Sequence, residues 1–317
     1  MWTWIQRTGV AAAVVASSLL AGCWDDDDDD KRNLVEAVQA DPEFSVLAEA
    51  VVAADLADTL SGEGPFTLFA PTNDAFTALL AELGLTKEQL FADKPLLTAV
   101  LTYHVVAGEV MAADIPQGSP ITTVQGGYFK IDTSSGALAV TDGRNRVSPI
   151  AATDEEVENG VIHVVDKVLL PADKTVVQTA AALAAGDPPE FTLLVEALQV
   201  TGLDATLSGT GPFTVFAPTD AAFVALLEEL GLTKDELFAD TALLSSVLTY
   251  HVVPDLVLAA DVPLDTPITT VQGGSFSVSG SLVITDTAGR TANITLTDVL
   301  AGNGVIHVID RVILPAL

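Results

Sequence analysis

Four histidines are the residues of this chain whose type and spacing could do chemistry. They come in two pairs with matching surroundings: two follow a tyrosine, and two lie in an Asn-Gly-Val-Ile-His-Val segment. These histidines are His104, His251, His163 and His307. Histidine can ligate a metal ion or act as a general base near neutral pH. The repetition therefore raises the question of one reactive site in each half of the chain.

The surroundings of the histidines favour a structural role over a reactive one. No third metal ligand, and no serine or cysteine nucleophile beside a base, accompanies them in both copies. Asp166 and Asp310 follow His163 and His307 by three positions, so on a strand they point to the opposite face. A polar side chain in an apolar strand needs hydrogen-bond partners. We expect buried histidines, no enzyme activity, no cofactor and no metal site; a metal or general-base site assisted by these aspartates is the alternative.

The single cysteine, Cys23, has a position that suggests covalent modification. Residues 1–22 carry one charge, Arg7, and an apolar stretch at residues 8–20 that is too short to cross about 30 Å of hydrocarbon as a helix. This arrangement is typical of a signal peptide. The Leu-Ala-Gly-Cys sequence that ends at Cys23 resembles a bacterial lipobox. We predict a lipoprotein that is tethered to a membrane through Cys23 without spanning it; an ordinary secretory signal with a leftover cysteine is the alternative.

The acidity of the chain excludes several classes of partner. Lys and Arg number 13 against 43 Asp and Glu, which gives a formal net charge of −30. Nucleic acids and anionic lipid surfaces are bound through Lys and Arg, so neither is expected as a partner. With 49% hydrophobic residues, the chain is too apolar to be disordered. Six consecutive aspartates at residues 25–30 predict an extended spacer; a sorting signal and a cation-binding tail are the alternatives.

The chain contains an internal duplication. The segment at residues 64–72, Gly-Pro-Phe-Thr-Leu-Phe-Ala-Pro-Thr, recurs with one change 147 residues later, and so does Tyr-His-Val-Val. The Asn-Gly-Val-Ile-His-Val segments are 144 residues apart. A period this long indicates two domains and not a solenoid, whose repeats run about 20–50 residues. We assign residues 1–22 to a signal peptide and residues 23–32 to a lipidated cysteine with its acidic spacer. Residues 33–172 form domain 1, and residues 175–317 form domain 2.

Each copy begins with helices and ends with strands. The spacing of apolar residues predicts a helix that starts at residue 41, and a later helix that leads into a strand at the histidine of the Tyr-His pair. Thr72 and Thr219 are expected to cap the helix after the first strand, with Asn73 and Asp220 favourable in its first turn. The segments that follow are rich in Val, Ile and Thr, with Gly-Gly and Asp-Gly turns. This order indicates an α+β fold.

Together these motifs resemble the signatures of the fasciclin (FAS1) family. Residues 66–76 and 159–171 are similar to its first and second signatures, and the Tyr-His pairs to its central motif; the second copy matches at residues 213–223 and 303–315. The resemblance implies two tandem domains, each a β-wedge or sandwich packed with several α-helices. It also implies non-enzymatic adhesion to cells, matrix or other proteins. The motif residues with an expected role in the fold or in an interaction are Thr72, Asn73, Tyr103, His104, Asn159, His163, Thr219, Asp220, Tyr250, His251, Asp298, Asn303 and His307.

One of these residues, Asp298, also has a counterpart in a contact motif. In animal fasciclin domains, an aspartate followed by an apolar residue at this place belongs to proposed integrin-contact motifs. Asp298 is followed by Val-Leu, which is similar, whereas Asp154 in the first copy is followed by Glu-Glu, which departs from the pattern. The resemblance therefore makes domain 2 the better candidate for such a contact, although we treat these residues mainly as determinants of the fold.

The function predicted from the sequence is adhesion at the bacterial cell envelope. A lipid-anchored pair of domains would bind protein or polysaccharide partners of cells, matrix or envelope, with avidity if a ligand engages both domains. Two alternatives stay open: an inward-facing structural or periplasmic interaction lipoprotein, and a carrier of a small molecule or lipid. The outer face and the periplasmic side are both open as locations. The folded part has no EF-hand-type loop, so only weak, diffuse binding of divalent cations to the acidic surface stays open.

Overall fold

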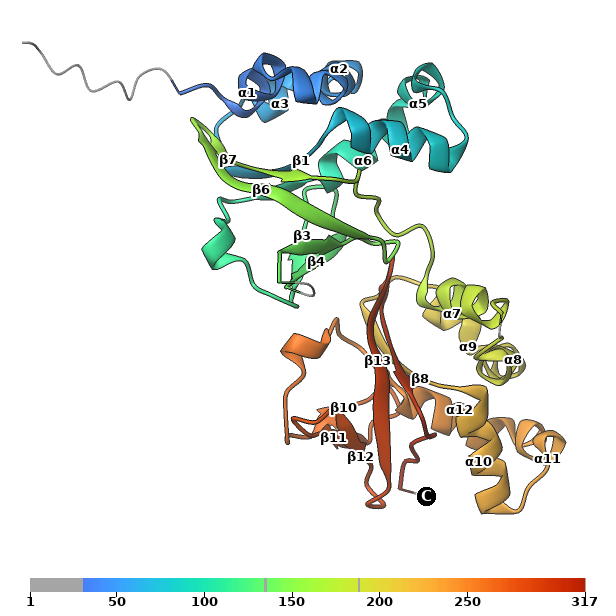
Figure 1. Ribbon diagram of the computed structural model, residues 1–317. Coiled ribbons are helices and arrows are strands. Elements are labelled where there is room, and N and C mark those ends of the chain that lie inside the picture. The colour runs from blue at the N-terminus through green and yellow to red at the C-terminus, as the bar shows by residue number, and fades with distance from the viewer. Residues whose placement is uncertain (1–30, 134–135, 188, 317) are drawn as a thin grey trace, which may run out of the picture. The chain divides into compact units, whose positions relative to one another are not determined.

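The computed structural model describes residues 31–133, 136–187 and 189–316. From Arg32 onward the chain forms one compact unit. The predicted signal peptide, Cys23 and the run of aspartates lie outside the described residues. The unit from Arg32 onward contains both copies of the duplication, and in each copy helices pack beside a seven-stranded sheet (Figure 1). Among the described residues, none of the helices combines the length and hydropathy that crossing a membrane requires.

Domain 1 is a seven-stranded sheet whose first strand follows three helices. Its helices are α1 (Leu34–Ala40), the 3₁₀ turn η2 (Pro42–Phe44), α2 (Ser45–Ala53), α3 (Ala57–Leu60), α4 (Asn73–Leu83), α5 (Lys87–Ala92), α6 (Lys94–Tyr103) and the 3₁₀ turn η3 (Ala112–Asp114). Its strands are β1 (Phe66–Pro71), β2 (Val105–Ala107), β3 (Pro120–Thr122), β4 (Tyr128–Asp132), β5 (Ala139–Thr141), β6 (Val147–Val157) and β7 (Gly160–Val165).

Domain 2 repeats this order of elements. Its helices are α7 (Val176–Ala184), α8 (Thr192–Thr201), α9 (Leu203–Leu207), α10 (Asp220–Leu230), α11 (Lys234–Ala239), α12 (Thr241–Tyr250) and the 3₁₀ turn η4 (Ala259–Asp261). Its strands are β8 (Phe213–Pro218), β9 (Val252–Val253), β10 (Ile268–Thr269), β11 (Ser275–Val278), β12 (Val283–Thr285), β13 (Thr291–Ala301) and β14 (Gly304–Ile309).

Both sheets are mixed and have the same topology. The strand orders are β2-β1-β7-β6-β5-β4-β3 and β9-β8-β14-β13-β12-β11-β10. The first motif strand pairs in parallel with the last one, β1 with β7 and β8 with β14, and the other pairs are antiparallel. The two motif segments of each copy are far apart in the sequence but form neighbouring strands. They occupy the same place in both sheets. The predicted α+β class is confirmed.

Among the described residues, each domain has two large hydrophobic cores, one on either face of the sheet. In domain 1, Leu68 and Ala70 of β1 face the core beneath the helices, and Phe69 between them faces the core enclosed by β3–β5. There Phe69 packs edge-on against Phe129 with ring centroids 5.0 Å apart. Successive side chains of a strand point to opposite faces, so a strand buried on both faces reads as a continuous apolar run. This explains why the first motif contains no polar alternation.

The helix predicted from residue 41 is present, because Asp41 caps the 3₁₀ turn η2, which continues directly into α2. The preceding helix α1, which begins at Leu34 with a capping box at Asn33, was not predicted. The predicted start of the strand after Tyr-His was wrong by one residue. The strands β2 and β9 begin one residue after His104 and His251, which instead end α6 and α12. The backbone N–H of each histidine donates to a helix carbonyl three residues earlier, which keeps it in the last turn.

Candidate functional site

His104 and His251 close the last turns of α6 and α12. In each ring Nδ1 lies 2.7 Å from the carbonyl oxygen four residues earlier. Nε2 accepts the backbone N–H of Leu169 at 2.8 Å in domain 1 and of Ile313 at 3.1 Å in domain 2. This pattern requires a neutral ring with its proton on Nδ1. Burial disfavours the charged form and lowers the pKa of both histidines to about 4.

His163 and His307 lie on the motif strands β7 and β14 and use the opposite tautomer. Nδ1 accepts the backbone N–H of Asp154 at 3.2 Å and of Asp298 at 3.3 Å. Nε2 donates to a loop carbonyl oxygen, at 2.8 Å in domain 1 and 2.9 Å in domain 2. Burial lowers the pKa of His307 below its usual range. Every ring nitrogen of the four histidines thus has a backbone partner.

The histidines therefore hold loops and strands together and present no free base to a substrate. A general base needs a ring nitrogen within reach of the proton that it removes. Within residues 31–133, 136–187 and 189–316, His, Asp, Glu and Cys side chains form no group of three that could hold a metal ion. The arrangement supports a scaffold role for all four rings.

Asp154 and Asp298 have the same local role, although the residues that follow them differ. Both adopt a positive φ, 62° and 59°, at irregularities in β6 and β13. Each carboxylate accepts the backbone N–H of the first residue of a 3₁₀ turn, from Ala112 of η3 at 2.7 Å and from Ala259 of η4 at 2.8 Å. The fold thus needs both aspartates. Asp298 has an additional contact to domain 1, described below.

The threonines predicted as helix caps are caps in the structure. Thr72 and Thr219 accept the backbone N–H three residues later at 3.2 Å. Asn73 also accepts the N–H of Val46 at 2.9 Å, and Asp220 accepts that of Leu193 at 2.8 Å. The first-turn residues thereby fix the start of α2 and α8 against the helix that follows the first strand.

Asn159 and Asn303 connect the second motif to the helices of their domains. Asn159 accepts the N–H of Leu34 at 2.8 Å, and its amide donates to two carbonyl oxygens at the end of α3, at 2.8 and 2.9 Å. Asn303 makes the equivalent contacts, accepting the N–H of Val176 at 2.8 Å. The Asn-Gly sequence therefore does more than form a turn, because it joins the first helix to the sheet.

Tyr103 and Tyr250 are fully buried and connect the last residue of α6 and α12 to the first residue of β4 and β11. Their hydroxyls donate to the carbonyl oxygens of Tyr128 and Ser275 at 2.6 Å. The Tyr103 hydroxyl also accepts the N–H of Gly143 at 2.8 Å. Burial raises the pKa of Tyr103 well above its usual range. The Tyr-His pair is thus part of the interior of each domain.

Three side chains of domain 1 that the sequence analysis did not single out contact domain 2. The Tyr128 hydroxyl lies 2.9 and 2.5 Å from two carbonyl oxygens at the β13–β14 turn. Asn145 donates to the carbonyl of Leu300 at 3.0 Å and accepts its N–H at 2.7 Å. Lys130 pairs with Asp298 at 2.8 Å. These contacts join β4 and the β5–β6 turn of domain 1 to the edge of β13.

The residues that make these contacts are positions at which the two copies of the duplication differ. At the equivalent positions domain 2 has Ser275, Ser277 and Gly289 in place of Tyr128, Lys130 and Asn145, and Ala288 in place of Arg144. Domain 2 therefore lacks the side chains with which domain 1 makes the contact. Differences between two otherwise similar copies would have pointed to the interdomain surface.

The pair of Lys130 and Asp298 is largely removed from water. The two side chains are 13% and 5% exposed, and Asp132 lies 3.1 Å from the same ammonium group. Burial opposes the charge of Lys130, but hydrogen bonds and attraction from Asp298 and Asp132 outweigh it and raise its pKa. Removing one partner of such a pair leaves a charge in the interior without compensation.

Lys130→Ser is expected to lower the free energy of unfolding by about 2–4 kcal/mol, because the buried carboxylate of Asp298 would lose its ammonium partner. Domain 2 has Ser277 at this position, so serine fits the strand. Urea denaturation measures the loss. The control Lys234→Ala removes an exposed pair with Glu196 and should cost less than about 0.5 kcal/mol. Equal losses for the two variants would contradict a buried interdomain ion pair.

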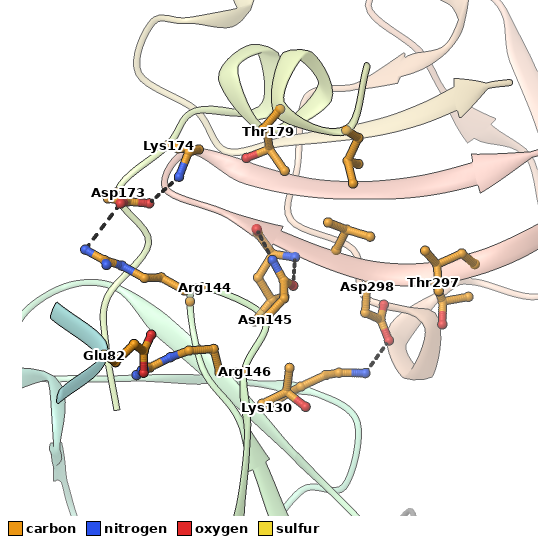
Figure 2. A pocket seen from close by; sticks show the side chains of 17 residues that line it. Glu82, Lys130, Arg144, Asn145, Arg146, Asp173, Lys174, Thr179, Thr297 and Asp298 are labelled. Atoms are coloured by element: carbon orange, nitrogen blue, oxygen red, sulfur yellow. Dashed lines mark hydrogen bonds and ion pairs between the residues drawn. The ribbon is translucent and has the colours of Figure 1, made fainter. Parts of the chain in front are cut away.

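A cleft of about 690 Å³ lies beside these contacts. Figure 2 shows Asn145 between two groups of side chains, with Arg144, Asp173 and Lys174 on one side and Lys130 and Asp298 on the other. Four of the chain's 13 Lys and Arg residues line the cleft: Lys130, Arg144, Arg146 and Lys174. Three carboxylates, Glu82, Asp173 and Asp298, also line it, so cations slightly outnumber anions here in a chain with a net charge of −30. The other wall is aliphatic, with Leu183, Leu296 and Val299.

Known proteins resemble the chain over both domains. The fasciclin domain profile matches residues 42–171 and 189–315. Protein sll1483 from Synechocystis sp. is 43% identical over 139 residues, which cover 44% of this chain and 73% of that protein. Human periostin is 29% identical over 221 residues, 69% of this chain but 24% of periostin. A solved FAS1 domain pair from the insect cell adhesion molecule fasciclin I aligns with 89% of this chain and 95% of its own, at 20% identity and a TM-score of 0.42.

The profile match covers most of the chain and includes the strands, caps and histidines described above. Domains of this family are typically non-enzymatic adhesion domains, which agrees with histidines whose ring nitrogens are all occupied by the backbone. The chain belongs to the fasciclin family and contains two tandem fasciclin domains.

Proposed function

We propose that this chain is an adhesion or interaction protein of the bacterial cell envelope, which binds protein or polysaccharide partners through its fasciclin domains. The observation that carries the proposal is the presence of two fasciclin domains in one chain, a family that includes adhesion proteins such as periostin. The contacts of Tyr128, Lys130 and Asn145 support a pair that acts as a unit. A ligand that engages both domains would gain avidity.

The direct test is binding by the purified chain to cells, to matrix polymers and to envelope extracts, over a range of ionic strengths and with or without Ca²⁺. Saturable binding to one of these surfaces is the expected result. Strengthening by Ca²⁺ would give the acidic surface a role in bridging. Absence of binding to all three surfaces at every ionic strength would contradict the proposal.

The proposed anchor is a lipid on Cys23. Cys23→Ser is expected to release the protein from the membrane fraction, because the thioether needed for lipid attachment cannot form. Membrane fractionation and mass spectrometry of the mature N-terminus measure this change. Retention of Cys23→Ser in the membrane fraction, together with an unmodified wild-type cysteine, would show that the segment is an ordinary secretory signal.

The second candidate function is an inward-facing interaction protein of the envelope. The same two domains would then bind periplasmic partners and not an external surface. Protease treatment of intact cells separates the two, since an outward-facing protein is cleaved and an inward-facing one is protected. We expect cleavage.

A further inference from the structure

Arg144, in the β5–β6 turn at the cleft, has a guanidinium edge that its partner only half occupies. Nε and Nη2 donate from the same edge, which matches the two oxygens of one carboxylate. Asp173 contacts Nη2 at 3.2 Å. Nε has no hydrogen-bond partner. Among the described residues, it is the only buried side-chain nitrogen or oxygen that lacks one. A buried donor without an acceptor is unfavourable.

The charges around this edge leave a surplus of positive charge. Asp173 also contacts Lys174 at 3.3 Å, so two cations share one carboxylate. That carboxylate is 43% exposed and lies between the two domains, outside any helix or strand. Arg146, in contrast, is satisfied by Asp142, Glu82 and a backbone carbonyl. Arg144 and Lys174 are therefore the cations available to an external anion.

The opposite wall of the cleft has the character of an alkyl-binding surface. Leu183 and Leu296 are 36% and 53% exposed, so their side chains offer apolar surface to a ligand in the cleft. No aromatic ring is among the described residues that line the cleft, which disfavours ligands that stack, such as nucleotides. The cleft volume of about 690 Å³ lies within the range of about 300–1,000 Å³ for sites of small molecules.

We propose that the cleft between the two domains binds an amphipathic carboxylate of the fatty-acid type. The carboxylate would replace Asp173 on the Nε/Nη2 edge of Arg144 beside Lys174, and the alkyl chain would lie on Leu183, Leu296 and Val299. The two walls of the cleft belong to different domains, since Arg144 lies in domain 1 and the two leucines lie in domain 2. The site therefore exists only in the tandem pair. It would act independently of adhesion.

The duplication supplies variants that fit the backbone. Domain 2 has Ala288 at the position of Arg144, and the two turns make the same amide contacts to an aspartate. Domain 1 has Ala152 at the position of Leu296, and both pair with a valine of the neighbouring strand. Arg144→Ala and Leu296→Ala are therefore expected to fold. Asp173→Asn removes the competing charge without shortening the side chain.

The test is titration calorimetry of the full chain with dodecanoate below its micelle concentration, with 1-dodecanol and acetate as ligands that lack the charge or the chain. We expect one saturable dodecanoate site per chain and at least about tenfold weaker binding of both controls. Arg144→Ala and Leu296→Ala should each weaken dodecanoate about tenfold, and Asp173→Asn should strengthen it. Lys234→Ala, which removes one positive charge far from the cleft, should leave the affinity unchanged.

Several outcomes would overturn the proposal. Equal affinities of dodecanoate and dodecanol, with no effect of Arg144→Ala or Asp173→Asn, would place the ligand on an apolar site such as the cavity of about 170 Å³ among α10, α11 and α12. Absence of saturable dodecanoate binding would exclude the site. Weakening by Asp173→Asn would show that this aspartate holds the cleft in shape and does not compete with the ligand.

Discussion

Replacing Gly160 with alanine is expected to unfold domain 1. A Cβ at this position would lie 1.9 Å from the carbonyl oxygen of Phe66, and φ is +154°. Phe66 and Gly160 are register partners in the parallel pair of β1 and β7, in the interior of the sheet. The clash is with backbone, so it can be relieved only by separating the two motif strands. We expect a loss above about 4 kcal/mol, beyond the common range of single substitutions, measured by urea denaturation.

Gly84→Ala is the matched control for this substitution. Gly84 ends α4 with φ at +65°, but nothing lies within 4 Å of an added Cβ. Its cost should be about 1–2 kcal/mol, the strain of a left-handed conformation alone. Gly304→Ala should reproduce the Gly160 effect in domain 2, where the distance to the Phe213 oxygen is also 1.9 Å. Similar losses for Gly160→Ala and Gly84→Ala would contradict the close approach of β1 and β7.

The second large effect is loss of stability at acid pH. His104 and His251 have a pKa of about 4 in the folded state, compared with about 6.5 when unfolded. The unfolded chain therefore takes up protons first as the pH falls below about 6.5, and each domain loses about 3 kcal/mol by about pH 4. Above about pH 7 both states are neutral, so these residues add no pH dependence there.

Urea denaturation at a series of pH values, with NMR titration of the histidine rings, measures this effect. We expect the ring resonances of His104 and His251 to stay in their neutral positions down to about pH 5 while the free energy of unfolding decreases. Titration of either ring near pH 6.5 in the folded protein would contradict its burial between a helix carbonyl and a backbone amide.

Local features of the fold could be predicted from the sequence because their causes are local. Thr72 caps α4 and Thr86 forms a capping box with Gln89, both through contacts that span three residues. The first helix, α1, was not predicted, because one of its stabilising contacts is not local. Asn33 provides the cap, but its helix has seven residues and is stabilised by Asn159, 125 residues away from Leu34. Such a contact has no trace in a short sequence window.

The interdomain contacts were missed because each depends on the arrangement of two domains. In the sequence, Asn145 is part of a turn between two strands, and its partner Leu300 lies 155 residues away. Asp298, read from the sequence as a candidate for an external contact, is buried against Lys130. The resemblance identified the family and its adhesion role, but it contained no information on residues in which the two copies differ.

Cell attachment tests the proposed adhesion function most directly. Surface and cell–cell attachment would be compared between wild-type cells, cells that lack the gene, and cells that produce Cys23→Ser, each with and without Ca²⁺. We predict loss of attachment in the deletion and in Cys23→Ser, with recovery when the wild-type gene is restored. Attachment of the deletion equal to that of wild type would contradict adhesion and favour an inward-facing role in the envelope.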